Sequence, residues 1–371
     1  MLQSIKIENY KILKNIKLNL SNLSIVSGLN SMGKSSLIQI LLLLRQSFEQ
    51  KVLTSKGLLL NGSYINVGNG KDALSIDADK EEFCFKLEWE NKDVLSMVFD
   101  YKSRSNLQPV ISLIPEKFDF SKALFSANFQ YLAAERIGPK SSYPVSDYAV
   151  KDLNSLGNNG EFTAHFLFEN GRKPLFNDKL NHSRAKSNTL LAQVDAWMSE
   201  ITPGIKITAN VIEEINQASI HYEFETGTGY TEKFRPENVG FGLTYVLPIV
   251  TAILASKKGD LIIVENPEAH LHPAGQSAIA QLIARAAEEG VQIIVETHSD
   301  HFLNGARIAV LKNIIDPSNT SFFYFLKEKD NIEHAINIIQ PFIDKNGRLD
   351  EWPDGFFDEW DKNLNVLLGE Q

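Results

Sequence analysis

The stretch from Gly28 to Ser36 reads GLNSMGKSS and fits the pattern G-x-x-x-x-G-K-[ST]. Glycines in such a loop let backbone N–H groups surround phosphate oxygens, and the start of a following helix adds a favourable dipole. A strand-like run precedes the loop and a long apolar run follows it, which is the context that this pattern requires. We therefore predict that the loop binds ATP, with Lys34 on the β- and γ-phosphates and the Ser35 hydroxyl on Mg²⁺. The residues predicted to contact the nucleotide here are Asn30, Ser31, Met32, Gly33, Lys34, Ser35 and Ser36.

A second candidate lies where the apolar run LIIV ends at Glu265. A phosphate-loop protein needs an acidic residue at the end of another strand to hold the Mg²⁺ shell. After the next apolar run, VQIIV, the chain continues as ETHSDHF, which places His298 just beyond a strand end. Ligands of open parallel sheets bind at the carboxyl ends of the strands. We therefore predict that Glu265 ligates Mg²⁺ and that His298 senses the γ-phosphate.

The elements that must position these residues follow from the sequence after Arg235. An apolar helix is predicted at 245–256, strands at 260–264 and 291–295, and helices at 273–289 and 299–307. Strands that alternate with helices predict a parallel sheet covered by helices. The expected fold class is therefore α/β, as in a P-loop NTPase.

The rest of the chain is expected to surround this sheet. Alternation predicts strands at 2–8 and 16–26, a strand-rich stretch at 57–133, long loops at 140–185, an amphipathic helix at 188–201, and two further strands at 205–214 and 218–226. The predicted parts are an N-terminal ATPase lobe (1–56), an inserted region (57–235), a C-terminal ATPase lobe (236–325) and a small acidic extension (326–371).

Composition excludes several classes of protein. The chain has 371 residues, 43% apolar and 22% charged, as globular proteins do. The apolar runs are too short to span a bilayer, the N-terminus lacks a signal-peptide core, and the single cysteine fits a reducing compartment. We therefore expect a cytoplasmic protein with no membrane partner. The net charge of −9 argues against broad binding to nucleic acid, although a local basic patch for DNA stays open.

Two blocks of the sequence carry a family resemblance. The N-terminal IKIENYKILKNIKLNL with GLNSMGKSS resembles the opening of the RecF, SMC and OLD-type ATPases, a branch of the ABC ATPases. The segments NVGFGLTYVLPIV, LIIVENPEAHLHPAGQ and IIVETHSDHFLN resemble bacterial predicted ATPases close to the OLD group, which commonly act in anti-phage defence and include the ATPase subunit of the Septu system. The tail DKNGRLDEWPDGFFDEW is similar to the small C-terminal domain of unknown function that ends many of them.

The resemblance implies an ABC-type ATPase head that forms a head-to-tail homodimer, or a higher homo-oligomer, around ATP. It also implies a separately encoded effector, a nuclease or toxin.

The resemblance implies further contacts with the nucleotide. Gly240, Gly242 and Thr244 match the signature motif, with which one protomer completes the ATP site of the other. Arg136 lies in YLAAERIGP, which resembles a motif that couples Mg²⁺ and γ-phosphate to the inserted region. Lys11 lies in a segment that in the family is near the nucleotide base and phosphates. Simpler interpretations also stand: a plain turn for the glycines, and a surface or salt-bridged role for Arg136.

The sequence departs from the family pattern at the catalytic carboxylate. ABC ATPases place a glutamate directly after the strand acid, but here Asn266 follows Glu265. An amide can orient water but cannot accept a proton at neutral pH. Glu268 is the nearest replacement, so Glu268, Asn266 and His298 are the predicted catalytic residues. Two hypotheses stay open: catalysis has moved to Glu268, or the protein hydrolyses ATP slowly or not at all and acts as a nucleotide-dependent scaffold.

Other features narrow the prediction. OLD nucleases continue into a Toprim domain, for which the segment after His298 is too short, and no sustained heptads predict a coiled coil. A DNA-repair ATPase of the RecF or SMC type is a third hypothesis, which the net charge disfavours, and an ABC transporter subunit is the least favoured. His270, His272, His298 and His301 could suggest a zinc site, but no cysteine supports one.

Overall fold

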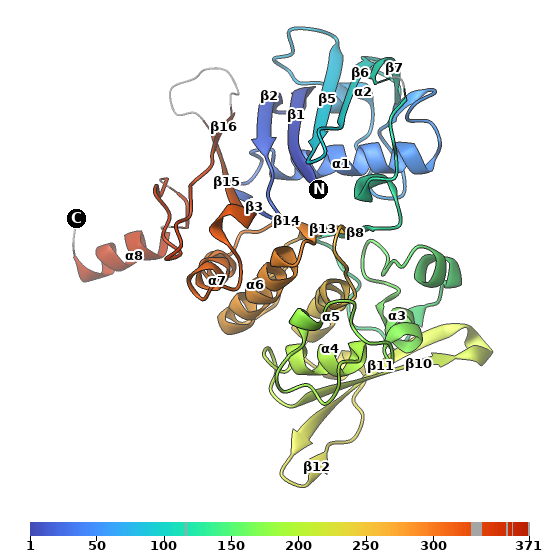
Figure 1. Ribbon diagram of the computed structural model, residues 1–371, viewed down its shortest axis with the longest axis vertical. Coiled ribbons are helices and arrows are strands. Elements are labelled where there is room, and N and C mark those ends of the chain that lie inside the picture. Colours follow the sequence, from blue (N-terminus) through green and yellow to red (C-terminus); the bar gives the residue numbers. More distant parts are fainter. Residues whose placement is uncertain (116, 328–335, 354, 358, 370–371) are drawn as a thin grey trace. The chain divides into compact units, whose positions relative to one another are not determined.

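The computed structural model describes residues 1–115, 117–327, 336–353, 355–357 and 359–369 (Figure 1). They form two compact units. Unit 1 comprises 1–126, 321–342 and 349–371, and unit 2 comprises 127–320 and 343–348. Residues 57–126, which were predicted to belong to an inserted region, thus share a compact unit with the phosphate loop. The division into four sequence parts stays a prediction.

Unit 1 contains an antiparallel sheet in the order β2–β1–β5–β6–β7–β4. Its strands are β1 (Leu2–Tyr10), β2 (Leu13–Asn19), β4 (Gly57–Leu59), β5 (Glu82–Trp89), β6 (Val94–Asp100) and β7 (Leu107–Ile114). In β5 every second residue is buried, as expected for a strand with one face on the core. The helix α1 (Lys34–Glu49) contacts β3 and β4 and adds a run of buried leucines to this core. Shorter elements are α2 (Gly70–Ala73), a 3-10 turn (Ala123–Phe125) and, near the C-terminus, α8 (Glu359–Leu368).

A second group of strands in unit 1 leads to the phosphate loop. β3 (Leu23–Gly28) lies beside β15 (Thr320–Lys327), which pairs with β16 (Ile336–Ile339). The prediction of one strand at 16–26 was wrong, because the chain breaks between β2 and β3. At the break, the Ser24 hydroxyl accepts a hydrogen bond from the Ser21 N–H at 3.1 Å, and such local bonds compete with strand pairing. The break lets β2 join the antiparallel sheet while β3 continues to the loop.

Unit 2 holds the parallel strands that were predicted after Arg235. β13 (Leu261–Glu265) lies between β8 (Phe129–Leu132) and β14 (Gln292–Glu296) and is parallel to both. The helices are α5 (Phe241–Leu254), α6 (Pro273–Glu288) and α7 (Asp300–Leu311). β13 and β14 are buried on both faces, which explains their unbroken Ile and Val runs. The alternation is confirmed, with α5 starting before its predicted position.

The remainder of unit 2 is a small antiparallel sheet with its own helices (Figure 1). The sheet contains β9 (Tyr143–Pro144), β10 (Ile205–Ile212), β11 (Gln217–Thr226) and β12 (Gly229–Tyr230). It contacts α3 (Thr163–Asn170) and α4 (Leu190–Met198). Single turns of helix lie at Tyr148–Asp152, Asp178–Leu180, Glu213–Ile215, Pro236–Asn238 and Pro317–Asn319. None of the helices in the described ranges is long and apolar enough to cross a membrane.

Candidate functional site

The phosphate loop depends on two glycines with left-handed backbone. Gly28 ends β3 with φ 141°, and Gly33 precedes α1 with φ 91°. A Cβ atom on Gly28 would lie 2.2 Å from the carbonyl oxygen of Phe325 in β15, so a side chain has no room there. Ser31, between the glycines, has φ 64°. The sequence pattern therefore predicted a loop whose conformation requires its glycines.

Lys34 is the first residue of α1, and only 4% of its surface is exposed. Its ammonium donates to the carbonyl oxygens of Gly28 at 2.9 Å and Leu29 at 2.7 Å, so the side chain turns back over the loop. Ser35 is exposed at the helix start, while Ser36 is buried. The first turn of α1 contains no acidic residue. This arrangement fits a polyphosphate, since a cation and the start of a helix attract anionic oxygens.

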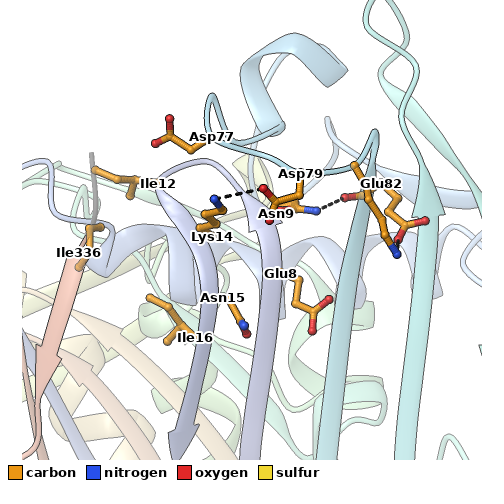
Figure 2. A pocket seen from close by; sticks show the side chains of 11 residues that line it. Glu8, Asn9, Ile12, Lys14, Asn15, Ile16, Asp77, Asp79, Glu82 and Ile336 are labelled. Carbon is orange, nitrogen blue, oxygen red and sulfur yellow. Dashed lines mark hydrogen bonds and ion pairs between the residues drawn. The ribbon is translucent and has the colours of Figure 1, made fainter. Parts of the chain in front are cut away.

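A cavity of about 410 Å³ lies beside the loop within unit 1 (Figure 2). Ile12 and Ile336 line it, and both would touch a Cβ placed on Gly33, at 2.9 and 3.3 Å. Its rim is polar, with Lys14 3.3 Å from Asp79. The cavity therefore has both apolar and charged lining residues and lies next to the predicted phosphate site. The other lining residues are Glu8, Asn9, Asn15, Ile16, Asp77, Lys80 and Glu82.

Lys11 lies in the turn between β1 and β2, with φ 50°. Its ammonium donates to Gln39 Oε1 in α1 at 2.7 Å, and the Tyr10 hydroxyl donates to the same atom at 3.2 Å. Burial lowers the pKa of Lys11. The structure thus joins Lys11 to the helix that follows the phosphate loop, while its predicted contact with nucleotide stays a prediction.

Two carboxylates end neighbouring strands in unit 2. Glu265 is the last residue of β13 and is in register with Glu296, the last residue of β14. The Tyr131 hydroxyl, from β8, donates to Glu265 Oε1 at 2.9 Å. Burial raises the pKa of Glu265, and the bond from Tyr131 opposes that rise. Sequence reasoning did not select Glu296, although a carboxylate that ends a second buried strand was a signal for it.

Asn266 has left-handed backbone, with φ 46°. Its N–H donates to the carbonyl oxygen of Glu296 at 2.8 Å, which ties the turn after β13 to the end of β14. Asparagine adopts this region much more readily than glutamate does. The backbone therefore gives a conformational reason against glutamate at the position where the family resemblance leads one to expect it.

Glu268 and His298 are brought together by the structure. Glu268 Oε1 accepts a hydrogen bond from the His298 backbone N–H at 2.7 Å. Within the described residues, Glu268 Oε2 is buried and has no hydrogen-bond partner. The His298 residue is exposed. The turn after β13 and the turn after β14 therefore share one carboxylate, whose second oxygen accepts no hydrogen bond within the described residues.

Arg136 lies in the interior of unit 2, with 3% of its surface exposed. Its guanidinium donates to the backbone carbonyls of Ala133, Tyr245, Glu265 and Asn266 at 2.6 to 3.0 Å. The Tyr245 ring lies 5.2 Å from the guanidinium carbon. Burial lowers the pKa of Arg136 to about 10. The simpler interpretation as a surface residue was wrong, and the structure uses this arginine to hold backbone carbonyls.

The signature-like residues differ in what they touch. Gly240 is exposed just before α5, with open space where a Cβ would be. A Cβ on Gly242 would lie 2.4 Å from the carbonyl oxygen of His270, so this glycine permits close packing of two backbones. Thr244 is 3% exposed, and its hydroxyl does not lie at the surface with Gly240. The role of these three residues at a partner's nucleotide stays a prediction. Gly240 fits that role best, because it is exposed.

The histidines proposed for zinc have other contacts. The His270 ring packs against the rings of Phe241 and Tyr245, with centroids 4.7 and 4.9 Å apart. His272 Nδ1 accepts a hydrogen bond from the Ala274 N–H at 3.4 Å and caps α6. These contacts support packing and capping roles.

Among the described residues, Asp147, His165 and Glu169 form one cluster of possible metal ligands. His165 Nδ1 accepts from the Ser146 N–H at 3.3 Å, so the neutral ring carries its proton on Nε2, which faces the two carboxylates. Lys151 already lies 3.0 Å from Asp147 and 3.4 Å from Glu169. The cluster is therefore better described as an ion-pair network.

Three family models match the chain. A model described as "AAA ATPase domain" matches residues 1–148, and one whose description includes "AAA domain" and "Type IV TA system" matches residues 154–304. A model described as "Protein of unknown function (DUF3696)" matches residues 315–367, in agreement with the predicted C-terminal resemblance. No curated protein sequence matches the chain.

Solved structures of SMC heads share the fold. One is an SMC head bound to the C-winged helix domain of ScpA, with a TM-score of 0.56 at 13% identity, covering 93% of this chain and 98% of that one. Another is an SMC head with an extended coiled coil bound to the C-terminal domain of ScpA derived from Pyrococcus furiosus, with a TM-score of 0.51 at 12% identity, covering 99% and 98%. The fold is that of a P-loop NTPase. At these identities the structural likeness establishes the fold alone, and together with the two AAA models it supports an ABC-like ATPase family. The predicted α/β fold class is confirmed.

Proposed function

We propose that this P-loop NTPase binds ATP with Mg²⁺ and hydrolyses it. The observation that carries the proposal is the phosphate loop, in which two left-handed glycines, a buried Lys34 and an acid-free helix start form a cradle for anionic oxygens. The donor set also suits Mg²⁺, because hydroxyl and carboxylate oxygens are its usual protein ligands. We propose Ser35 and Glu265 as the ligands of the ion, which would supply charge neutralisation on the phosphates.

In this proposal each residue has a defined task. Lys34 neutralises the β- and γ-phosphates, and the backbone N–H groups of the loop fix their position. Glu268 Oε2 positions the attacking water and takes its proton, while Asn266 contributes hydrogen bonds but no basicity. His298 senses the γ-phosphate. The cavity lined by Ile12 and Ile336 receives the nucleoside, and Lys11, which is bonded to Gln39 of α1, contacts the nucleotide.

Phosphate release from ATP and Mg²⁺, with a Lys34→Ala control, tests this proposal. Wild-type turnover is expected to exceed that of the variant by about 10²–10³-fold, the usual cost of losing a charge stabiliser. Equal rates, with nucleotide binding intact in the wild type, would favour a scaffold that holds ATP without cleaving it. A wild-type protein that neither turns over nor binds ATP would exclude both the ATPase and the scaffold.

The scaffold is the second candidate because of Asn266. The amide is not a base, and the left-handed backbone disfavours glutamate at this position. A slow enzyme could keep a nucleotide-bound state for long periods before release. A single-turnover measurement distinguishes slow chemistry from slow product release.

We propose further that two copies associate head-to-tail around ATP, each using its Gly240 region at the other's nucleotide. The exposed Gly240 and its open surroundings support this. Glu268→Gln protein is expected to double in mass by light scattering when ATP and Mg²⁺ are added. Adding Gly240→Arg is expected to abolish the shift, whereas Gly227→Arg is the matched control, since it also has open space around it. A shift unaffected by Gly240→Arg contradicts this interface.

We propose that the ATPase regulates a separately encoded effector, a nuclease or toxin, in cytoplasmic anti-phage defence. Support comes from the sequence resemblance, from the "Type IV TA system" description of one matching model, and from SMC heads that bind a ScpA domain. Pull-down of products of adjacent genes with the tagged chain, with and without ATP, tests the partner. Phage plating on cells with wild-type or Lys34→Ala protein tests the defence role.

Direct action on DNA is less well supported. Two lysines of the first sheet, Lys6 and Lys86, are paired with Glu8 at 2.5 Å and Glu88 at 2.6 Å. Lysines that are paired with carboxylates release few counterions when DNA binds. Duplex binding that weakens steeply with salt would therefore be evidence in favour of direct action on DNA.

A further inference from the structure

Arg136 bonds to three separate elements of unit 2. It donates to Ala133 O in the segment after β8, to Tyr245 O in α5, and to the carbonyls of Glu265 and Asn266 at the end of β13. A guanidinium is well suited to this task, because its planar fork presents several donors in fixed directions. Burying such a charge is costly unless its donors are paired, and here backbone carbonyls accept four hydrogen bonds from it.

The turn that begins at Glu265 is held from its other side as well. Asn266 N–H donates to Glu296 O at 2.8 Å, and Glu268 accepts from His298 N–H at 2.7 Å. Arg136 thus links this turn to α5, the helix that follows the exposed Gly240. The rings of Phe241, Tyr245 and His270 pack together at the same junction.

We propose that Arg136 is a positioning residue rather than a ligand of the nucleotide. It fixes where the carboxylates of Glu265 and Glu268 stand relative to the start of α5, and it acts on the reaction only through them. The proposal rests on the proposed ATPase function. It replaces the expectation that Arg136 contacts ATP, since the residue is 3% exposed and its four hydrogen bonds all go to backbone carbonyls within unit 2.

A purely architectural arginine would give a different pattern of effects. Loss of positioning lowers kcat and raises the Mg²⁺ concentration needed for half-maximal activity, with little change in ATP affinity. Loss of a nucleotide contact raises KM or Kd for ATP. If Arg136 only stabilises the fold, its loss lowers the melting temperature, and activity falls only in proportion to the fraction of protein that stays folded.

Arg45 provides a matched control in unit 1. It is also buried, and it donates to the backbone carbonyls of Leu124 at 3.0 Å and Ser126 at 2.6 Å. Arg45 Nε also pairs with Glu49 at 2.6 Å. Arg45→Lys therefore removes another buried guanidinium that binds backbone carbonyls, without touching the turn after β13.

The experiment compares Arg136→Ala, Arg136→Lys, Arg45→Lys and wild type in Mg²⁺ titrations of ATP turnover, with ATP binding and melting temperature measured alongside. We expect Arg136→Ala to lower kcat by about 10²-fold, the cost of misplacing a reacting group by about 1 Å. Arg136→Lys should recover part of kcat, ATP affinity should stay within about threefold, and Arg45→Lys should keep the wild-type Mg²⁺ dependence.

Several results would overturn the proposal. They are an Arg136→Lys protein with wild-type kcat and Mg²⁺ dependence, a loss confined to ATP affinity, an equal kcat loss in folded Arg45→Lys, or failure of Arg136→Lys to fold while Arg45→Lys folds. The failure of the ATPase proposal is recognised separately, as wild-type turnover no higher than that of Lys34→Ala.

Discussion

The phosphate loop of unit 1 and the carboxylate turn of unit 2 are stabilised in different ways. The loop depends on missing side chains, since Gly28 and Gly33 have backbone angles and neighbours that exclude a Cβ. The turn after β13 depends on a side chain that bonds to backbone, because Arg136 binds the carbonyls of Glu265 and Asn266. A short motif therefore describes the first region well, whereas the second requires residues far apart in sequence.

The largest effect is expected at Glu268 in the turn. Glu268→Gln keeps an acceptor for the His298 N–H but removes the base, so turnover should fall by about 10²–10⁴-fold with stability nearly unchanged. Phosphate release and a melting curve measure the two quantities. Turnover at the wild-type rate would remove Glu268 from catalysis.

The second largest effect is expected at a glycine of the phosphate loop, compared with a glycine that has no close neighbours. Gly28→Ala imposes a left-handed φ on alanine and a contact with Phe325 O, so we expect a loss of about 1–3 kcal/mol from backbone strain, together with loss of ATP binding. Gly227→Ala, which meets no atom within 4 Å, should change the free energy of unfolding by under about 0.5 kcal/mol. Denaturant titration measures both; equal effects would mean that the loop tolerates a side chain.

A smaller effect tests why an amide occupies position 266. Asn266→Glu should lower the free energy of unfolding by about 1–2 kcal/mol without raising turnover, because glutamate is disfavoured at φ 46°. Asn266→Asp is the control, since aspartate adds a carboxylate and tolerates this backbone better. If Asn266→Glu hydrolysed ATP faster than the wild type, the missing carboxylate rather than the backbone angle would be what limits this position.

The smallest expected effect concerns the support of Glu265. Tyr131→Phe removes one hydrogen bond to that carboxylate and should cost about 1 kcal/mol, with a higher Mg²⁺ requirement for turnover. Tyr64→Phe is the control, because that hydroxyl also donates to a carboxylate, Glu49 Oε1 at 2.9 Å, and neither residue is a predicted ligand. Equal Mg²⁺ requirements in the two variants would exclude a supporting role for Tyr131.

These contrasts explain how much the sequence could predict. The loop, the strand ending at Glu265 and the alternation after Arg235 depend on local patterns, and the structure contains those elements. The break between β2 and β3 was missed because a Ser21–Ser24 hydrogen bond outweighed apolar alternation. Arg136 and Glu296 were misjudged or overlooked because their partners lie on other elements, and a spacing pattern does not record which backbone carbonyl a side chain reaches.

The close packing of Gly242 against His270 O has a consequence for how the protein could be changed. The start of α5 and the segment at His270 are separated in sequence by β13 but are in van der Waals contact. A larger side chain in either segment would therefore clash with the other. A variant that enlarges position 242 becomes viable only after the HLH segment has moved, and that movement shifts the residues preceding α6. Attempts to redesign the start of α5 should therefore vary both stretches in the same library.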